Sequence, residues 1–361
     1  MSPRVLWVVV DSLGLHHLTP EVMPRLYALG AEGGRADNGG IGELPALTYP
    51  NHATFVTGAS PLAHGVMAND VFRAGAWVGA EEVGPAVPTV FEAASGAGLQ
   101  SVAVFGDQNL VGVCGARSAW RHWPPDGVHD AATPKGVTGY ATDAAVVRAV
   151  QDIEPQDSAL TFVQLDEMDA DSHLHGPQSE NARERARAVD RCLVEMLALY
   201  EPVWSDTLVV VLSDHCQEEV AVGASVAFDV AMAGLLGTDP PLNPLQGDAR
   251  GRWRTDGTAG WVASDAGLSA ADVEAIEGIA HVRGLEDGSL AAWGAEGSLL
   301  GFDWGQRGDH GSGRTAAQVA VVGGGHPLAA RLGRWIGTTA PRGRDWCGWV
   351  LAALGLTEGH D

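Results

Sequence analysis

The sequence is poor in basic residues. It has 22 Lys and Arg against 45 Asp and Glu in 361 residues, so its formal net charge is −23 and its pI is about 4.8. A chain of this charge has no electrostatic footprint for nucleic acid phosphates and is repelled by acidic lipid surfaces. We therefore exclude nucleic acid duplexes and membranes as partners. An anionic substrate would need local neutralisation, which bound metal ions could supply.

Cysteine is scarce, and long apolar runs are missing. No CxxC pair occurs among the four cysteines, so the sequence suggests neither a zinc ribbon nor a disulfide framework, and free thiols in a reducing compartment are expected. The apolar run before Asp11 has about six residues, too few for a signal-peptide core or a membrane span. We therefore expect a cytoplasmic protein.

The length and the apolar content bound the architecture. A hydrophobic fraction of 45% is ordinary for a globular protein and excludes wholesale disorder. At about 150 residues per domain the chain has room for roughly two domains, and one large α/β domain with an insertion fits equally well. The sequence leaves the oligomeric state open.

Apolar runs alternate with helical patterns along most of the chain. Three segments have helical spacing, 20–29, 142–152 and 180–200, and a further helix is expected to begin at Pro50. The alternation predicts an α/β fold with a doubly wound, mostly parallel sheet and helices on both faces. The expected strands are 5–10, 100–105, 160–165, 207–212 and 317–322.

One stretch departs from this alternation. Residues 226–300 are rich in Gly, Pro and Asp and have short apolar runs, which predicts a small α+β insertion or lid. Residues 1–225 and 301–361 are then expected to form the core domain.

Acidic and imidazole side chains follow the predicted strands. Ligand sites in open α/β sheets gather at the carboxyl ends of strands. Each of these residues alone could be an ordinary loop side chain, but together they supply the oxygen and nitrogen ligands that zinc or manganese binds. The set expected at one rim of the sheet is Asp11, Asp169, His173, Asp214, His215 and His310, with Thr48 ahead of a predicted helix.

Several of these residues lie in segments that resemble a known family. The chain is similar to the alkaline phosphatase superfamily, and within it to the nucleotide pyrophosphatase/phosphodiesterase branch. The resemblance supports the α/β fold. The segments are VVVDSLG, MPRLYALGAEGG, LTYPNHATFVTGASPLAHGVMAN, DEMDADSHLHGP, VVVLSDH and GDHG, in the order that the family has them.

The resemblance implies a role for each residue. Asp169, His173 and His310 match the ligands of one metal ion. Asp11, Asp214 and His215 match those of a second ion, which Thr48 also contacts. Thr48 matches the nucleophile, and Asn69 matches a hydrogen-bond donor to a phosphoryl oxygen. The family's usual metals are two zinc ions, although Asp/His sites also accept manganese or iron.

The resulting expectation is a two-metal hydrolase of a small phosphate ester, specifically a phosphodiesterase or nucleotide pyrophosphatase with a phospho-threonine intermediate. Three alternatives remain open: carbon–phosphorus cleavage of a phosphonate, as in phosphonoacetate hydrolase; a phosphomonoesterase; and a non-catalytic member that binds metal or ligand. The sequence departs from the family at Cys216, where a Gly usually follows the Asp-His pair.

Overall fold

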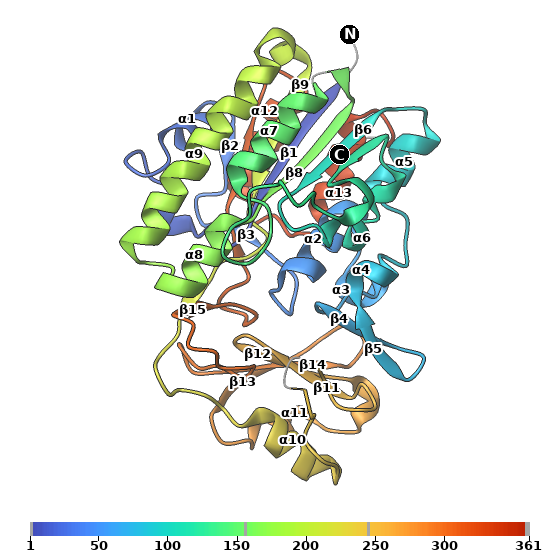
Figure 1. The fold of residues 1–361 in the computed structure, drawn as a ribbon, viewed down its shortest axis with the longest axis vertical. Coiled ribbons are helices and arrows are strands. Elements are labelled where there is room, and N and C mark those ends of the chain that lie inside the picture. Colours follow the sequence, from blue (N-terminus) through green and yellow to red (C-terminus); the bar gives the residue numbers. More distant parts are fainter. Residues whose placement is uncertain (1–2, 155–156, 244–245, 358–361) are drawn as a thin grey trace.

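A mixed seven-stranded sheet forms the larger part of the molecule (Figure 1). The computed structural model describes residues 3–154, 157–243 and 246–357. β1 pairs in parallel with β8 and β9, and β6 pairs in parallel with β8 and β7. β17 runs antiparallel to β9, and β2 antiparallel to β17. The spatial order is β2 (Gly34–Arg35), β17 (Ala320–Gly323), β9 (Thr207–Leu212), β1 (Arg4–Val10), β8 (Leu160–Leu165), β6 (Ser101–Phe105) and β7 (Arg121–Trp123).

Helices cover both faces of this sheet, as the sequence predicts. Alternate residues of β1 enter two separate cores, Trp7 on one face and Leu6 on the other, which explains why the strand is apolar throughout. One core is covered by α2 (Thr48–Thr57), α5 (Val90–Gly96), α6 (Leu110–Val113), α12 (Ala329–Thr338) and α13 (Asp345–Ala353). The other is covered by α1 (Pro24–Glu32), α7 (Asp143–Ile153) and α9 (Glu180–Tyr200).

Three predicted elements differ in the structure. The helix expected over 20–29 is α1, which runs from Pro24 to Glu32. The expected strand 317–322 is interrupted at Val319, whose N–H donates to the Ser213 hydroxyl instead of continuing a ladder. Residues before the break form β16 (Ala317–Gln318), which pairs with β3 (Gly40–Ile41), and residues after it form β17. The helix expected at Pro50 begins at Thr48, because the N–H groups of the first helical turn need no intrahelical acceptor and Pro is tolerated there.

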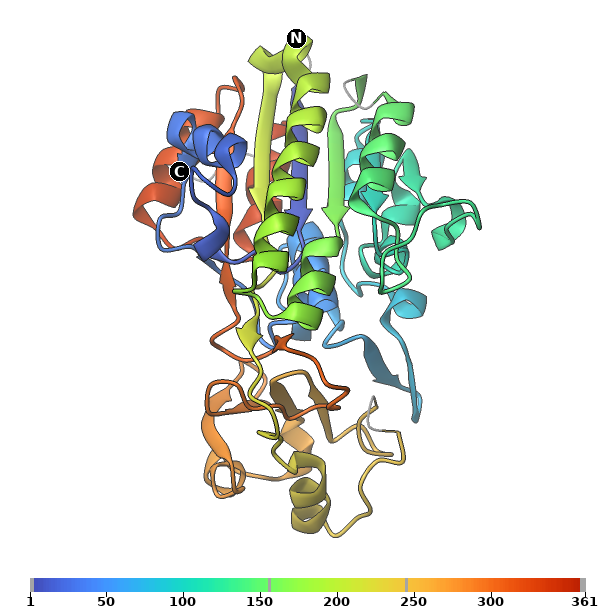
Figure 2. The ribbon, with the colours of Figure 1, turned by 60° about the vertical axis from the view of Figure 1, so that its left-hand side comes forward.

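A second, four-stranded antiparallel sheet lies at the far end of the molecule from the N-terminus (Figures 1 and 2). Its order is β11 (Trp253–Asp256), β12 (Ala259–Val262), β14 (Leu290–Gly294) and β13 (Ile279–Gly284). α10 (Phe228–Leu236) and α11 (Ala270–Glu274) share a small apolar core with it. β10 (Glu218–Glu219) and β15 (Gly308–Asp309) pair where the chain passes between the two parts. The domain bounds 226–300 stay a prediction.

Short elements complete the fold. α8 carries two of the predicted ligands, and the β4–β5 hairpin follows Asn69. These short elements are α3 (Pro61–His64), β4 (Asp70–Arg73), β5 (Ala76–Gly79), α4 (Ala80–Val83), α8 (Glu167–His175) and the 3-10 turns Leu15–His17, Ala116–Ser118, Pro125–Gly127, Glu201–Asp206 and Ser264–Ala266.

The structure describes all four cysteines, and none forms a disulfide. Within the described ranges, no helix combines the length and the apolar character needed to cross a bilayer. The cytoplasmic location stays a prediction.

Helix α1 receives its N-terminal cap from another helix. Asp190 of α9 is buried, and its carboxylate accepts hydrogen bonds from the backbone N–H groups of Arg25 (3.0 Å) and Leu26 (2.9 Å). We expect Asp190→Ala to lower the free energy of unfolding by about 2 kcal/mol, because it leaves two helix N–H groups without a charged acceptor. Urea denaturation measures this. Glu184→Ala, which removes an exposed carboxylate from the same helix, is the control and should change stability by less than about 0.5 kcal/mol.

Candidate active site

Four aspartates follow the four adjacent parallel strands at the centre of the sheet. Asp11 comes directly after β1, and Asp166 directly after β8. Asp214 follows β9, and Asp107 follows β6, each after one intervening residue. Because parallel strands have their carboxyl ends at the same edge, these four side chains line one rim of the sheet. The four carboxylates are therefore concentrated at one edge of the sheet.

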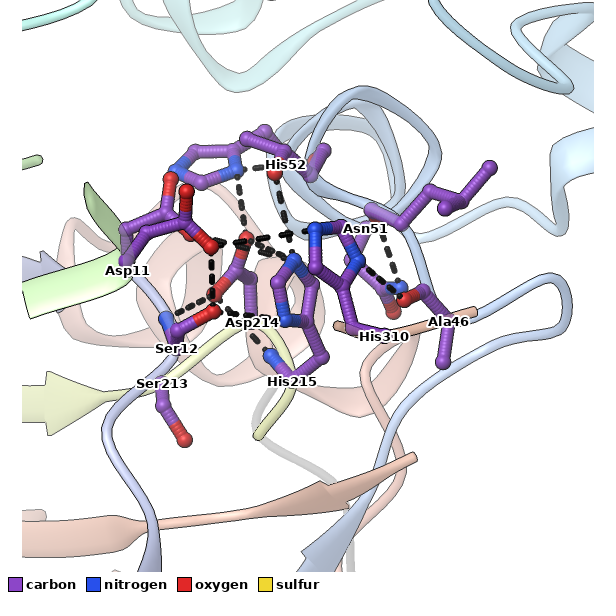
Figure 3. Close-up of polar contacts among 12 residues, drawn as sticks. Asp11, Ser12, Ala46, Asn51, His52, Ser213, Asp214, His215 and His310 are labelled. Carbon is purple, nitrogen blue, oxygen red and sulfur yellow. Dashed lines mark hydrogen bonds and ion pairs between the residues drawn. The ribbon is translucent and has the colours of Figure 1, made fainter. Parts of the chain in front are cut away.

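The structure brings the six predicted ligands together in two groups at this rim. Asp169, His173 and His310 form one group, and Asp11, Asp214 and His215 form the other. Within each group the ligand atoms lie within 4.8 Å of one another. The two groups adjoin, since the rings of His215 and His310 stack with centroids 3.9 Å apart and an interplanar angle of 15°. Figure 3 shows this stack beside Asp11 and Asp214.

Helix α8 and strand β15 build the first group. Asp169 and His173 are one helical turn apart on α8, and His173 Nε2 lies 3.4 Å from Asp169 Oδ2. The Nδ1–H of His173 donates to the carbonyl of Gly308 in β15 (2.8 Å). Gly308 has to be glycine, because a Cβ there would lie 2.5 Å from the carbonyl oxygen of Ser172. The close approach of β15 to α8 thus fixes the His173 ring.

The imidazole rings of His173, His215 and His310 direct Nε2 toward the carboxylates of the two ligand groups, while Nδ1 of each ring makes a hydrogen bond outside them. His310 Nδ1–H donates to the Ala46 carbonyl (3.1 Å), just as His173 donates to Gly308. A carbonyl oxygen only accepts, so the proton of each neutral ring lies on Nδ1 and the Nε2 lone pair is free. His215 differs, since its Nδ1 lies 3.1 Å from the hydroxyl of Ser12. Burial lowers the pKa of His215 well below its usual value, which favours the neutral form that ligates metals.

Buried carboxylate oxygens in the second group lack hydrogen-bond donors. Asp11 is 2% exposed and Asp214 is 0% exposed, yet Asp11 Oδ1 and Asp214 Oδ2 have no hydrogen-bond partner. Burial, with repulsion from Asp214 and Asp169, raises the pKa of Asp11 well above its usual value. Burial raises the pKa of Asp214 to about 8. Burying these two oxygens in ionised form is unfavourable unless positive charge lies close to them.

Thr48 lies directly beside the second group. As the first residue of α2 it follows the extended residue Leu47, and its hydroxyl oxygen is 3.1 Å from His215 Nε2. His52, one turn further along the helix, donates its Nδ1–H to the Thr48 carbonyl (2.9 Å). Asn51 accepts from the Glu43 N–H (2.8 Å) and donates to the Leu47 carbonyl (3.1 Å). The loop that leads into Thr48 is therefore held on both sides.

These residues face a cavity of about 220 Å³. Asn69 lines it, as do Thr48, Asp11 and all three residues of the first group, whereas Asp214 and His215 are fully buried below it. Aromatic side chains complete its wall: Tyr49, Tyr140, Phe302 and Trp304. Among the described residues that line this cavity there is no Lys or Arg.

Several residues of the site were missed by the sequence analysis. Ser12 and Gln217 both donate to Asp169 Oδ1, at 2.7 and 2.6 Å, and so orient that carboxylate. Neither position carries a signal in a single sequence. Asp107 and Asp166 could have been found, because both follow apolar strands in the same way as Asp11.

Cys216, where the sequence departs from the resembling family, lies beside the site without facing it. Its thiol is 4.0 Å from the Arg314 carbonyl, and burial raises its pKa to about 12. At neutral pH it is therefore a packed, protonated thiol.

The fold and this rim of aspartates and histidines define a class, the alkaline phosphatase-like α/β proteins. Residues 5–233 match the sequence profile described as type I phosphodiesterase / nucleotide pyrophosphatase. The chain belongs to this family, within the alkaline phosphatase superfamily, and the family identifies it as a hydrolase of phosphate esters. The comparison with curated protein sequences gives no match.

Solved structures share the fold over nearly the whole chain. Phosphonoacetate hydrolase from Sinorhizobium meliloti, in complex with phosphonoformate, is 16% identical with a TM-score of 0.68, covering 98% of this chain and 96% of its own. An inactive form of murine ectonucleotide pyrophosphatase/phosphodiesterase 5, in complex with AMP, is 15% identical with a TM-score of 0.66, covering 99% and 96%. The human counterpart is 14% identical with a TM-score of 0.68, covering 100% and 96%.

Proposed function

We propose that the protein is a two-metal phosphodiesterase that acts through a covalent phospho-threonine at Thr48. The observation that carries this proposal is the position of Thr48. Its hydroxyl lies 3.1 Å from His215, beside two adjoining groups that each offer three metal-ligating side chains. Membership of the phosphodiesterase family supports the reaction class.

The residues fit two divalent cations, of which zinc is the first candidate and manganese or iron the others. The donor set is mixed carboxylate and imidazole, and each imidazole has Nδ1 engaged so that Nε2 is available. The unpartnered oxygens Asp11 Oδ1 and Asp214 Oδ2 point to missing positive charge. Asp169, His173 and His310 would hold one ion; Asp11, Asp214, His215 and Thr48 would hold the other. Bound there, the cations would supply charge neutralisation and lower the pKa of the attacking hydroxyl.

The chain's own residues account for the remaining steps. Thr48 Oγ1 attacks phosphorus, the first alcohol leaves, and a phospho-threonine ester remains. Asn69 lines the same cavity and offers an amide N–H to a non-bridging phosphoryl oxygen. Thr48 is also the first residue of α2, whose free N–H groups favour an anion. Water then attacks phosphorus and releases Thr48.

The charge of the cavity supports a diester over a monoester. A monoester dianion carries nearly two charges at neutral pH, and enzymes commonly meet the second charge with Arg. This cavity offers the neutral Asn69, and its described lining contains no Lys or Arg. A singly charged diester is therefore the better match.

A second candidate is carbon–phosphorus cleavage, since the fold is also that of phosphonoacetate hydrolase. Its substrate has an additional carboxylate, for which the metal-facing cavity holds no described basic partner. We therefore rank it below diester hydrolysis.

A substrate panel tests the reaction class. We expect kcat/KM for bis-p-nitrophenyl phosphate to exceed that for p-nitrophenyl phosphate by at least about tenfold, or roughly 1.4 kcal/mol in transition-state binding. A p-nitrophenyl nucleotide ester and phosphonoacetate complete the panel. Faster turnover of the monoester than of every diester would refute the diester assignment, and selective cleavage of phosphonoacetate would establish the second candidate.

Metal content is the second test. Elemental analysis should find about two divalent ions per chain, with loss of activity after chelation. His310→Ala removes a ligand from the first group only, so about one ion should remain. His281→Ala, which removes an exposed histidine from β13, is the matched control and should retain both. Full activity in metal-free protein is incompatible with the proposal.

The nucleophile is tested at Thr48. Thr48→Ala should lower kcat on bis-p-nitrophenyl phosphate by at least about a thousandfold, because the attacking oxygen is lost. Thr48→Ser should retain part of the activity. Thr57→Ala, at the other end of α2, is the control for effects on the helix. Near-normal turnover of Thr48→Ala would mean that water attacks the diester directly.

Ser12 is expected to position the second metal group. Its hydroxyl contacts His215 Nδ1 and donates to Asp169, yet its backbone has φ of +61°, a conformation that glycine adopts more easily. Ser12→Gly should therefore change the stability of the metal-free protein only a little, because relief of the positive φ offsets the lost hydrogen bonds. The affinity for the second cation should fall about 10- to 100-fold, the usual effect of removing a hydrogen-bond partner of a ligand.

Isothermal titration with zinc and thermal unfolding measure the two effects separately. Ala74→Gly is the matched control, because Ala74 also has a positive φ (+51°) but lies in the turn of the β4–β5 hairpin. An unchanged zinc affinity in Ser12→Gly would show that the Ser12 hydroxyl does not position the metal ligands.

A further inference from the structure

A second cavity adjoins the metal-facing one and has no role in the chemistry described above. Its volume is about 370 Å³, larger than the 220 Å³ beside Thr48. Leu47, the neighbour of Thr48, and Asp256 of β11 line both cavities. A group esterified to phosphorus at Thr48 can therefore extend from one cavity into the other.

The two walls of this cavity come from distant parts of the chain. The β4–β5 hairpin, which follows Asn69, provides one wall, and β11 and β12 of the smaller sheet provide the other. Figure 1 shows the hairpin reaching toward the smaller sheet. The cavity thus depends on how the two sheets are held relative to each other.

Arg254 fixes the walls in place. It is 6% exposed, and its guanidinium donates to Asp70 of the hairpin (3.4 Å) and to Asp256 of its own strand (3.0 Å). It also lies 5.8 Å from the centroid of the Trp77 ring, and the indole N–H of Trp77 donates to the Asp248 carbonyl (2.9 Å). These contacts keep the cavity open without a ligand, so no binding free energy is spent on forming it.

The lining is suited to an uncharged group. Three arginines and three aspartates line the cavity, so their formal charges cancel. Of the arginines, Arg254 is buried between its two carboxylates, and the other two are exposed, where water screens their charge. The rest is apolar and aromatic, including Met67, Phe72, Trp77 and Trp261. Cavities of this size and composition are typical of small-molecule sites.

We infer that this cavity holds an uncharged, ring-sized apolar group of the substrate, so that the preferred substrate is a phosphodiester with one aromatic or bulky apolar alcohol. The inference rests on the proposed phosphodiesterase function, which it makes more specific. Apolar area that leaves water on binding supplies the preference. The carboxymethyl group of phosphonoacetate is small and has no ring to bury against the aromatic part of this lining.

A series of 4-nitrophenyl phosphodiesters tests the inference. The second ester group is methyl, phenyl or 1-naphthyl, the leaving group is 4-nitrophenolate throughout, and each kcat/KM is divided by the uncatalysed hydrolysis rate of the same diester. We expect kcat/KM to rise from methyl to 1-naphthyl by about tenfold or more, because burial of the ring is favourable. Equal values across the series for an active enzyme would overturn the inference and leave the phosphodiesterase function intact.

Two variants act on opposite features of the cavity. Ala263→Phe places a ring in the cavity, and Phe72→Ala removes part of its aromatic wall. In both variants the ratio of kcat/KM for the 1-naphthyl and methyl esters should fall toward one. Ala76→Phe is the matched control, because Ala76 belongs to the same hairpin but is exposed and does not line the cavity, so the ratio should stay at the wild-type value. An unchanged ratio in both test variants would contradict the inference.

A binding measurement separates this inference from the proposed function. Diphenyl phosphate should bind Thr48→Ala protein at least about tenfold more tightly than dimethyl phosphate, and Ala263→Phe in that background should remove the difference. If this holds but wild type hydrolyses no diester, the phosphodiesterase proposal fails and the cavity assignment stands. If neither binding selectivity nor hydrolysis is found, both fail.

Discussion

Burial of negative charge at the rim of the larger sheet is the constraint on which the rest of the site depends. Asp11, Asp169 and Asp214 are held close together, and burial disfavours the ionised forms of Asp11 and Asp214. Neutral donors meet part of this cost, since Ser12 and Gln217 donate to Asp169. Asp11 Oδ1 and Asp214 Oδ2 still have no hydrogen-bond donor. A rim built in this way is stable as an ionised cluster only when positive charge is added.

The three histidines of the rim are each oriented by a hydrogen bond at Nδ1. His173 and His310 are each anchored through Nδ1 by a backbone carbonyl, so their orientation depends only on where the chain runs. His215 is anchored by the Ser12 side chain, which in turn contacts Asp169. Through this serine the two groups share one hydrogen-bond network. A cation bound in one group would therefore affect the ligands of the other.

In the proposed function, both parts of the molecule contribute to substrate recognition. The larger part supplies Thr48, at the start of α2, and the acidic rim of its sheet. The smaller sheet supplies one wall of the adjoining cavity and, through Asp256, part of the metal-facing one. Arg254 of the smaller sheet joins the two parts through Asp70 of the hairpin, and Asp256 of its own strand also holds its guanidinium. The acidic rim and the apolar surface to which we assign the alcohol are thus adjacent but separate.

The sequence by itself determined the four parallel strands β1, β6, β8 and β9, the 180–200 helix and the residues at the strand ends, but it missed the short parallel strand β7. These follow from local patterns: apolar runs mark strands buried on both faces, and parallel strands present their carboxyl ends at one edge. It placed the start of α2 two residues late. It also joined β16 to β17, because the hydrogen bond that the Val319 N–H donates to the Ser213 side chain is invisible in the pattern. Only the tertiary structure decided the role of Ser12, the close approach of Gly308 to α8 and the cavity between the two sheets. Each of these depends on contacts between residues far apart in the chain, whose distance no local periodicity encodes.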